Sequence, residues 1–149
     1  MIPDESAGSS LIVRVTCRIV ARLIQIFALY VIFHGHYSPG GGFQGGALLA
    51  TAIILLRLGE GLRRSRREFN PEWAMPLGAV GVLIYAGVGM ADLLAGGNFL
   101  QYEYTPLPEM NAAQMHYWGI LIVEIGVGLA VMSVLVAIFD RLLEGQNDD

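Results

Sequence analysis

Four long apolar stretches constrain the fold of this chain more than any other feature. They cover about 11–34, 43–62, 74–94 and 117–143. A helix needs about 20 mainly apolar residues to cross roughly 30 Å of hydrocarbon, and each stretch meets that length. Of all residues, 54 % are hydrophobic and only 15 % are charged, whereas soluble domains carry about 25 % charged residues. The sequence therefore predicts an all-α integral membrane protein with four transmembrane helices.

The rest of the chain reads as short connections and ends around one domain, 1–149. Residues 99–115 hold two prolines, two acids and two tyrosines, which is typical of a surface loop. The first ten residues, 1–10, carry acid and no base, so they do not resemble a secretory signal. We expect 1–10 and 145–149 to be flexible.

The third stretch has clear boundary signals. Asn70 and Pro71 precede it, as a cap and a first-turn proline would at the start of a helix. Gly96 and Gly97 follow it and are expected to end the helix.

The basic residues give an orientation. All are arginine, and with four crossings all lie on one side: Arg14, Arg18, Arg22, Arg57, Arg63, Arg64, Arg66, Arg67 and Arg141. The positive-inside rule then places both termini and the 57–73 connection in the cytoplasm, and the 99–115 loop outside the cytoplasmic membrane. The first three share one helix face, where they either reach lipid phosphates or pair with acids of a neighbouring subunit. The net charge of -4 argues against a nucleic-acid partner.

The turn between the first two stretches reads FHGHYSPGGGFQGGALLA over residues 33–50. Polar, flexible backbone is tolerated at membrane depth only where protein or water satisfies it, so a packed turn within a larger assembly is expected. The glycines are expected to supply positive φ angles and close backbone approach. No Gly-Lys-Ser/Thr follows, which excludes a phosphate-binding loop. The structural turn residues are His36, Pro39, Gly40, Gly41, Gly42, Phe43, Gly45 and Gly46.

Small residues recur at helical spacing in three stretches. The rows are Gly42, Gly46 and Ala50; Gly87, Ala91 and Ala95; and Gly119, Gly126 and Gly128. Such rows let helices approach closely in lipid. They either pack these four helices together or dock them on other membrane chains.

Two acids lie within the apolar stretches, and they are the chemical candidates. An ionisable side chain in a membrane span usually faces protein or water and suggests function. Glu124 is a candidate for a proton or ion path, with a structural hydrogen bond or a cross-subunit ion pair as the alternative. Asp92 is a weaker candidate, because the outer interface would hydrate it.

Histidines titrate near neutral pH and suit proton transfer. On the expected topology His34, His36 and His116 lie toward the outer half, near Glu124. His34 and His36 either bond carbonyl groups of their own turn or, for His34, join a relay. The spacing lacks a zinc motif. The sequence also shows no nucleophile with a base, so no metal, cofactor or catalytic residue is expected.

The turn motif, followed by HYWGILIVEIGVGLAV at 116–131, resembles the MnhB family, one of the small components of Mrp-type multisubunit sodium/proton antiporters. The same module occurs in membrane-bound hydrogenases and related complexes with a complex-I-like membrane arm. The resemblance implies a four-helix component that lies next to other small Mrp-type subunits and large antiporter-like subunits. Carried over by motif, the turn residues match, as do Gly119, Glu124, Ile125 and Gly126. Antiporter members often have Asp where this chain has Glu124.

Two functions follow from this resemblance. The chain either contributes to a sodium or proton path, in an antiporter or a redox-driven, hydrogenase-type complex, or it serves as a scaffold without touching ions. It has no lysine, whereas the pumping chains of complex-I-like arms use membrane Lys–Glu pairs. We therefore expect a transport or accessory subunit rather than an enzyme or the pump itself.

Overall fold

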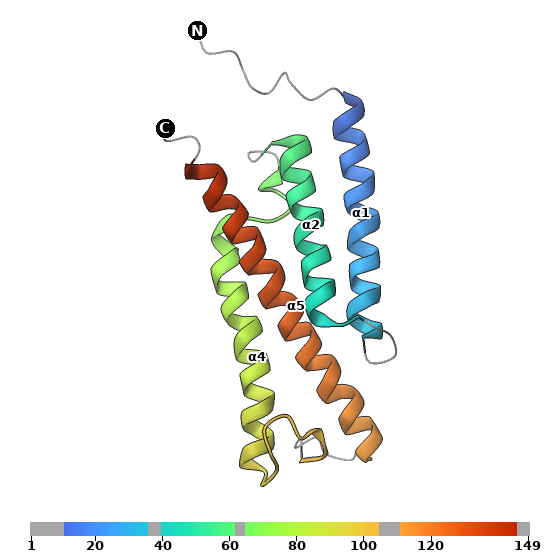
Figure 1. Cartoon of the computed structure of the whole chain (residues 1–149), viewed down its shortest axis with the longest axis vertical. Coiled ribbons are helices and arrows are strands. Elements are labelled where there is room, and N and C mark those ends of the chain that lie inside the picture. Colours follow the sequence, from blue (N-terminus) through green and yellow to red (C-terminus); the bar gives the residue numbers. More distant parts are fainter. Residues whose placement is uncertain (1–10, 36–39, 62–64, 105–110, 146–149) are drawn as a thin grey trace.

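The computed structural model describes residues 11–35, 40–61, 65–104 and 111–145, and it confirms the four predicted helices (Figure 1). They are α1 (Leu11–His34), α2 (Gly42–Glu60), α4 (Ala74–Leu94) and α5 (Ala112–Gly145). All four are long and apolar enough to cross a membrane. Gly145 closes α5, and the predicted flexible segments 1–10 and 146–149 lie outside the described residues.

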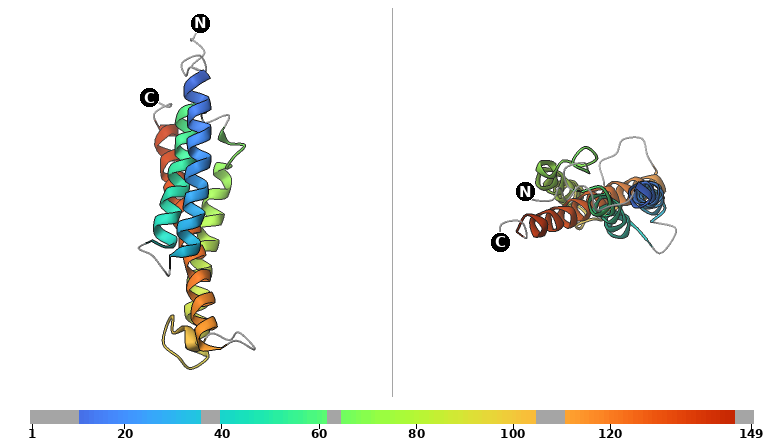
Figure 2. Two further views of the ribbon diagram at one scale, coloured as in Figure 1. Left: turned by 90° about the vertical axis from the view of Figure 1, so that its right-hand side faces the viewer. Right: turned by 90° about the horizontal axis from the view of Figure 1, so that it is seen from above.

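The helices run alternately up and down and form an open row rather than a closed bundle. In space the order is α1, α2, α5, α4, because α5 packs between α2 and α4. Among the described residues α1 and α2 do not contact α4. Seen from above, the row is elongated (Figure 2). Both broad faces of the row are therefore available to lipid or to other chains.

Glycines set the spacing within this row. A methyl group on Gly46 of α2 would lie 2.5 Å from the carbonyl oxygen of Gly128 in α5. On the other side of α5, a methyl group on Gly81 of α4 would lie 2.5 Å from the carbonyl oxygen of Gly126. Real Cβ atoms do not come so close, so these glycines allow backbone-to-backbone contact. Such contact is how helices associate in lipid, where apolar burial provides little drive.

The row of small residues predicted in the third stretch does not face the other helices. Gly87 has open space where a side chain would stand, and Ala95 is exposed. The glycines of α4 that make contact are instead Gly78, Gly81 and Gly89. A spacing of four identifies residues on one helix face, but it does not say which face meets a neighbour.

The boundary signals before and after α4 are confirmed. The Asn70 side chain accepts a hydrogen bond of 3.2 Å from the Glu72 amide, and Pro71 opens a short 3-10 helix, η2 (Pro71–Trp73), that leads into α4. At the other end Gly96 has a φ of 93°, a value that glycine adopts without strain. The chain then turns back, and the Phe99 ring lies over Gly89.

Two of the three arginines on α1 are paired within the chain. Arg18 lies 2.8 Å from a Glu60 carboxylate oxygen, and Arg22 lies 2.6 Å from one of Glu68. These pairs tie α1 to the end of α2 and to the segment that follows it. The expectation that Arg18 and Arg22 bind lipid phosphates or a neighbouring subunit is therefore wrong, since acids close in space, though far along the chain, take their charges.

Candidate functional site

Glu124 lies directly against the glycine turn. A methyl group on Gly35 would overlap the Glu124 carboxylate, and one on Gly41 would lie 3.1 Å from its Oε1 atom. A methyl group on Gly42 would overlap the Glu124 backbone. The Oε2 atom is shielded from solvent although the residue as a whole is only half-buried. Three glycines therefore form the space that the carboxylate occupies.

The local backbone explains why glycine is needed here. Gly41 has a φ of 130° and stands just before the first residue of α2. Side chains rarely adopt that conformation, and the Gly41 carbonyl accepts the first bond of the helix, 2.9 Å from the Gly45 amide. The start of α2 thus meets the Glu124 carboxylate, and the positive end of a helix dipole favours a negative charge.

The rest of the predicted turn is partly described. Gly45 packs against Ala28 and Ile32 of α1, where a methyl group would lie 3.0 Å from the Ala28 carbonyl oxygen. Phe43 projects outward and is exposed. Gly40 is half-buried, whereas His36 and Pro39 lie outside the described residues.

Asp92 and Tyr102 lie at the end of α4 and in the segment that follows. The Asp92 side chain is fully buried. Tyr102 belongs to a short 3-10 helix, η3 (Tyr102–Tyr104), and its ring lies over Gly119 of α5. Burial raises the pKa of the Tyr102 phenol above its ordinary value of 10.0, and nearby Asp92, Tyr85 and Glu124 raise it further. Both predicted acids therefore act on the same neutral phenol.

The histidines differ in their surroundings. His116 is exposed, and its ring meets the Tyr102 ring edge-on with centroids 5.7 Å apart. The Nδ1 atom of His34 lies 3.1 Å from the Tyr30 carbonyl oxygen, and the two rings stack at 4.2 Å. His34 thus bonds a carbonyl of its own helix rather than one of the turn. No three His, Cys, Asp or Glu side chains gather as metal ligands within the described part of the chain.

A second buried charge was not predicted from the sequence. Arg57 of α2 forms an ion pair with Asp140 of α5, and the two side chains are 0 % and 5 % exposed. An Arg57 nitrogen also donates to the Phe69 carbonyl at 3.3 Å. The sequence groups Arg57 with the basic connection and gives no indication of a partner. Only its position inside the 43–62 stretch, unlike the cluster at 63–67, is a signal that could have suggested burial.

These features define a class. The chain is a multi-pass α-helical protein of the prokaryotic cytoplasmic membrane, with one carboxylate enclosed by a glycine turn and a buried ion pair near the opposite helix ends. A family model described as "Domain related to MnhB subunit of Na+/H+ antiporter" matches residues 12–137. The chain therefore belongs to the MnhB family, as the resemblance predicted.

Curated relatives match along most of their length. The MnhB-type Na(+)/H(+) antiporter component of Alkalihalophilus pseudofirmus is 33 % identical over 125 residues, which cover 79 % of this chain and 86 % of the relative. The protein of the same name from Bacillus subtilis is 27 % identical over 139 residues, which cover 89 % of this chain and 96 % of the relative.

Proposed function

We propose that this chain is a membrane subunit of a multisubunit sodium/proton antiporter and that Glu124 belongs to its ion or proton path. The observation that carries the proposal is the contact between the Glu124 carboxylate and the glycines of the α1–α2 turn. A carboxyl group within a membrane span is costly and usually functional. The glycine backbone leaves it room to bind and release a small cation or a proton.

Neighbouring groups extend this proposed path. Tyr102 senses the charges of both Asp92 and Glu124, and its ring contacts His116. A neutral phenol both donates and accepts hydrogen bonds, so it suits a position between two acids. His34 is the remaining candidate, since it immediately precedes Gly35, which faces Glu124.

Partners and orientation follow from the same reasoning. The open row leaves many large apolar side chains exposed, which fits contact with lipid, with other small Mrp-type subunits and with large antiporter-like subunits. The relatives are named as antiporter subunits. The arginine-bearing helix ends gather at one end of the row, which supports a cytoplasmic position for both termini. A hydrogenase-type redox module stays a prediction of the resemblance alone.

The alternative is a scaffold subunit that does not touch the ions. The close glycine contacts of α5 with α2 and with α4 favour it, because they show that glycines serve packing elsewhere in this chain.

The two functions separate when Glu124→Gln is tested in the purified complex, reconstituted in vesicles that hold a pH-sensitive dye. Glutamine keeps the size of the side chain and loses its titration. If Glu124 lies on the path, sodium-driven proton movement is lost or slowed while the subunits stay together. Glu103→Gln, an exposed residue of η3, is the matched control and should exchange normally. Wild-type exchange in an intact Glu124→Gln complex would establish the scaffold function instead.

A further inference from the structure

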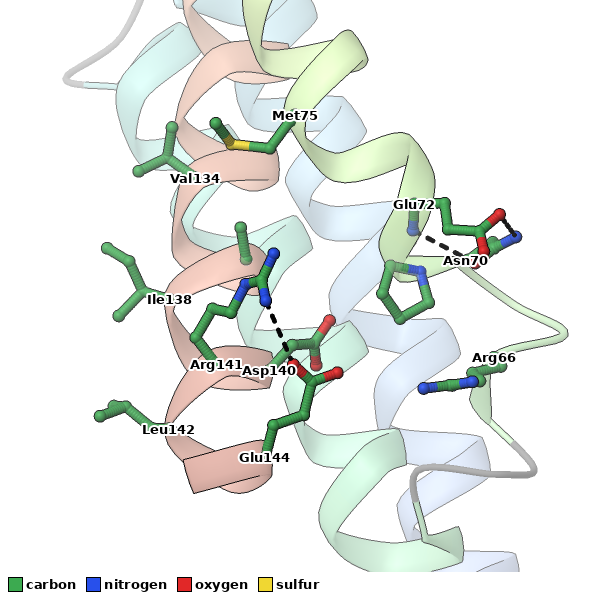
Figure 3. Close-up of a pocket in the computed structure, with 12 residues that line it drawn as sticks. Arg66, Asn70, Glu72, Met75, Val134, Ile138, Asp140, Arg141, Leu142 and Glu144 are labelled. Carbon is green, nitrogen blue, oxygen red and sulfur yellow. Dashed lines mark hydrogen bonds and ion pairs between the residues drawn. The ribbon is translucent and has the colours of Figure 1, made fainter. Parts of the chain in front are cut away.

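A groove lies between the start of α4 and the end of α5, at the arginine-bearing end of the row (Figure 3). Its volume is about 710 Å³, which is within the range of roughly 300–1,000 Å³ for small-molecule sites. It is separate from the Glu124 site, because it opens beside the opposite ends of these helices.

The polar lining of the groove carries balanced charge. Arg66 and Arg141 supply two guanidinium groups, and Glu72 and Glu144 supply two carboxylates. The fifth charged group, Asp140, already pairs with Arg57 on its other side. A ligand that matches this lining therefore carries one positive and one negative group rather than a net charge.

These charges are only weakly engaged with one another. Arg141 and Glu144 are 3.5 Å apart, with side chains 83 % and 45 % exposed. Exposed pairs of this kind contribute about 0.2–1 kcal/mol. In contrast, Arg22 and Glu68 on another part of the molecule lie 2.6 Å apart and are hydrogen-bonded. The groove charges are thus open to a bound ligand.

The apolar lining runs away from these charges into the membrane. Val134 and Ile138 precede Arg141 on α5 by one to two turns, and Met75 faces them from the start of α4. Figure 3 shows the charged residues toward the end of α5 and the apolar ones further along the groove. A charged end continued by an apolar channel has the polarity of a lipid lying in a bilayer.

We propose that this groove binds a zwitterionic aminophospholipid. Arg66 and Arg141 bind its phosphate, Glu72 and Glu144 bind its primary ammonium, and an acyl chain lies along Val134 and Ile138. Guanidinium groups suit phosphate because they donate in a planar fork, and basic pockets between membrane helices are known to bind lipid head groups. A lipid with a phosphate but no ammonium would leave the two glutamates unpaired and repelled, so it binds more weakly.

The test uses the intact complex that contains this chain, delipidated in mild detergent and titrated with short-chain phosphatidylethanolamine or phosphatidylglycerol. Native mass spectrometry counts the lipids retained on this chain. Arg66→Gln with Arg141→Gln should weaken retention of phosphatidylethanolamine at least about tenfold, since charge-assisted bonds are lost. Arg67→Gln changes an exposed neighbour that does not line the groove, and it should have no effect.

Glu72→Gln with Glu144→Gln is the more specific variant. It should abolish the preference for phosphatidylethanolamine over phosphatidylglycerol while both lipids still bind, and Glu103→Gln should leave that preference intact. Two results would overturn the proposal. One is equal retention of the two lipids by the wild type, and the other is a cross-link from position 138 or 142 to another protein chain, which would show that protein fills the groove.

Discussion

Arg57 of α2 and Asp140 of α5 form an ion pair that is almost entirely withdrawn from solvent, with side chains 0 % and 5 % exposed. The same two helices meet through glycine at Gly46 and Gly128. Between these contacts lies an apolar cluster formed by Ala50, Ile53, Met132 and Val136. The α2–α5 interface therefore combines close backbone packing with one polar tie near the arginine-bearing end.

Removal of one partner of this ion pair should be strongly destabilising. Asp140→Asn leaves the Arg57 charge buried without its counter-charge, a change that costs about 3–5 kcal/mol in comparable sites. We expect a lower yield of assembled complex and a lower temperature of thermal unfolding in detergent.

The double variant Arg57→Met with Asp140→Leu is the control for that prediction. Apolar residues of similar size often replace a buried pair without loss, so the double variant should recover most of the stability. If Asp140→Asn alone behaves as the wild type does, the buried ion pair is not a stabilising element of this chain.

The glycine turn should not tolerate side chains. Gly41→Val places a β-branched residue at a φ of 130° and against the Glu124 carboxylate, so we expect assembly to fail. The readout is the amount of this chain that purifies with its partner subunits.

Gly87→Ala is the matched control for the turn. It lies in the middle of α4 with open space around it, and alanine improves on glycine by about 1 kcal/mol in a helix. This variant should assemble at least as well as the wild type. A complex that forms normally with Gly41→Val would show that the turn is not closely packed.

Part of this structure is evident from the sequence, because local signals determine it. The bounds of α4 follow from the Asn70 cap and from the glycines after Leu94. The start of α5 at Ala112 comes earlier than predicted, since polar residues there mask the helix from a hydropathy pattern. Asn111 and Gln114 cap each other reciprocally, with bonds of 3.1 and 2.9 Å, and that capping box was the missed signal.

The contacts between distant segments are what the sequence does not show. Glu124 is recognisable as an acid in an apolar stretch, but the sequence does not say that Gly35 and Gly41 surround it. The pairing of Arg57 with Asp140 depends on α5 lying beside α2. Both relationships come from the order of the helices in the row, which no local pattern encodes.

The order α1–α2 in the row can be checked through the only cysteine of the chain, Cys17. A Cβ atom on Gly59 would lie 2.6 Å from the Cys17 sulfur, so Gly59→Cys should form a disulfide with Cys17 after a small backbone adjustment. Mild oxidation in membranes should then give a faster-migrating band that reductant removes. Gly87→Cys should give no such band, because α4 does not contact α1 among the described residues. Absence of the band in Gly59→Cys would argue against this pairing.

The last prediction concerns pH and Tyr102, whose pKa burial raises above 10.0, with further contributions from Asp92, Tyr85 and Glu124. Below pH 10 the phenol is neutral in both the folded and the unfolded chain, so the full stability is present. As the pH rises through the raised pKa, the unfolded chain ionises first and stability is lost. The difference in tyrosinate absorbance between the wild type and Tyr102→Phe isolates this residue among the six tyrosines. Its midpoint should lie above 10.0, and Asp92→Asn should lower it, because removing a nearby negative charge makes the phenolate less costly. A midpoint that Asp92→Asn leaves unchanged would separate Asp92 from Tyr102 and from the path proposed around Glu124.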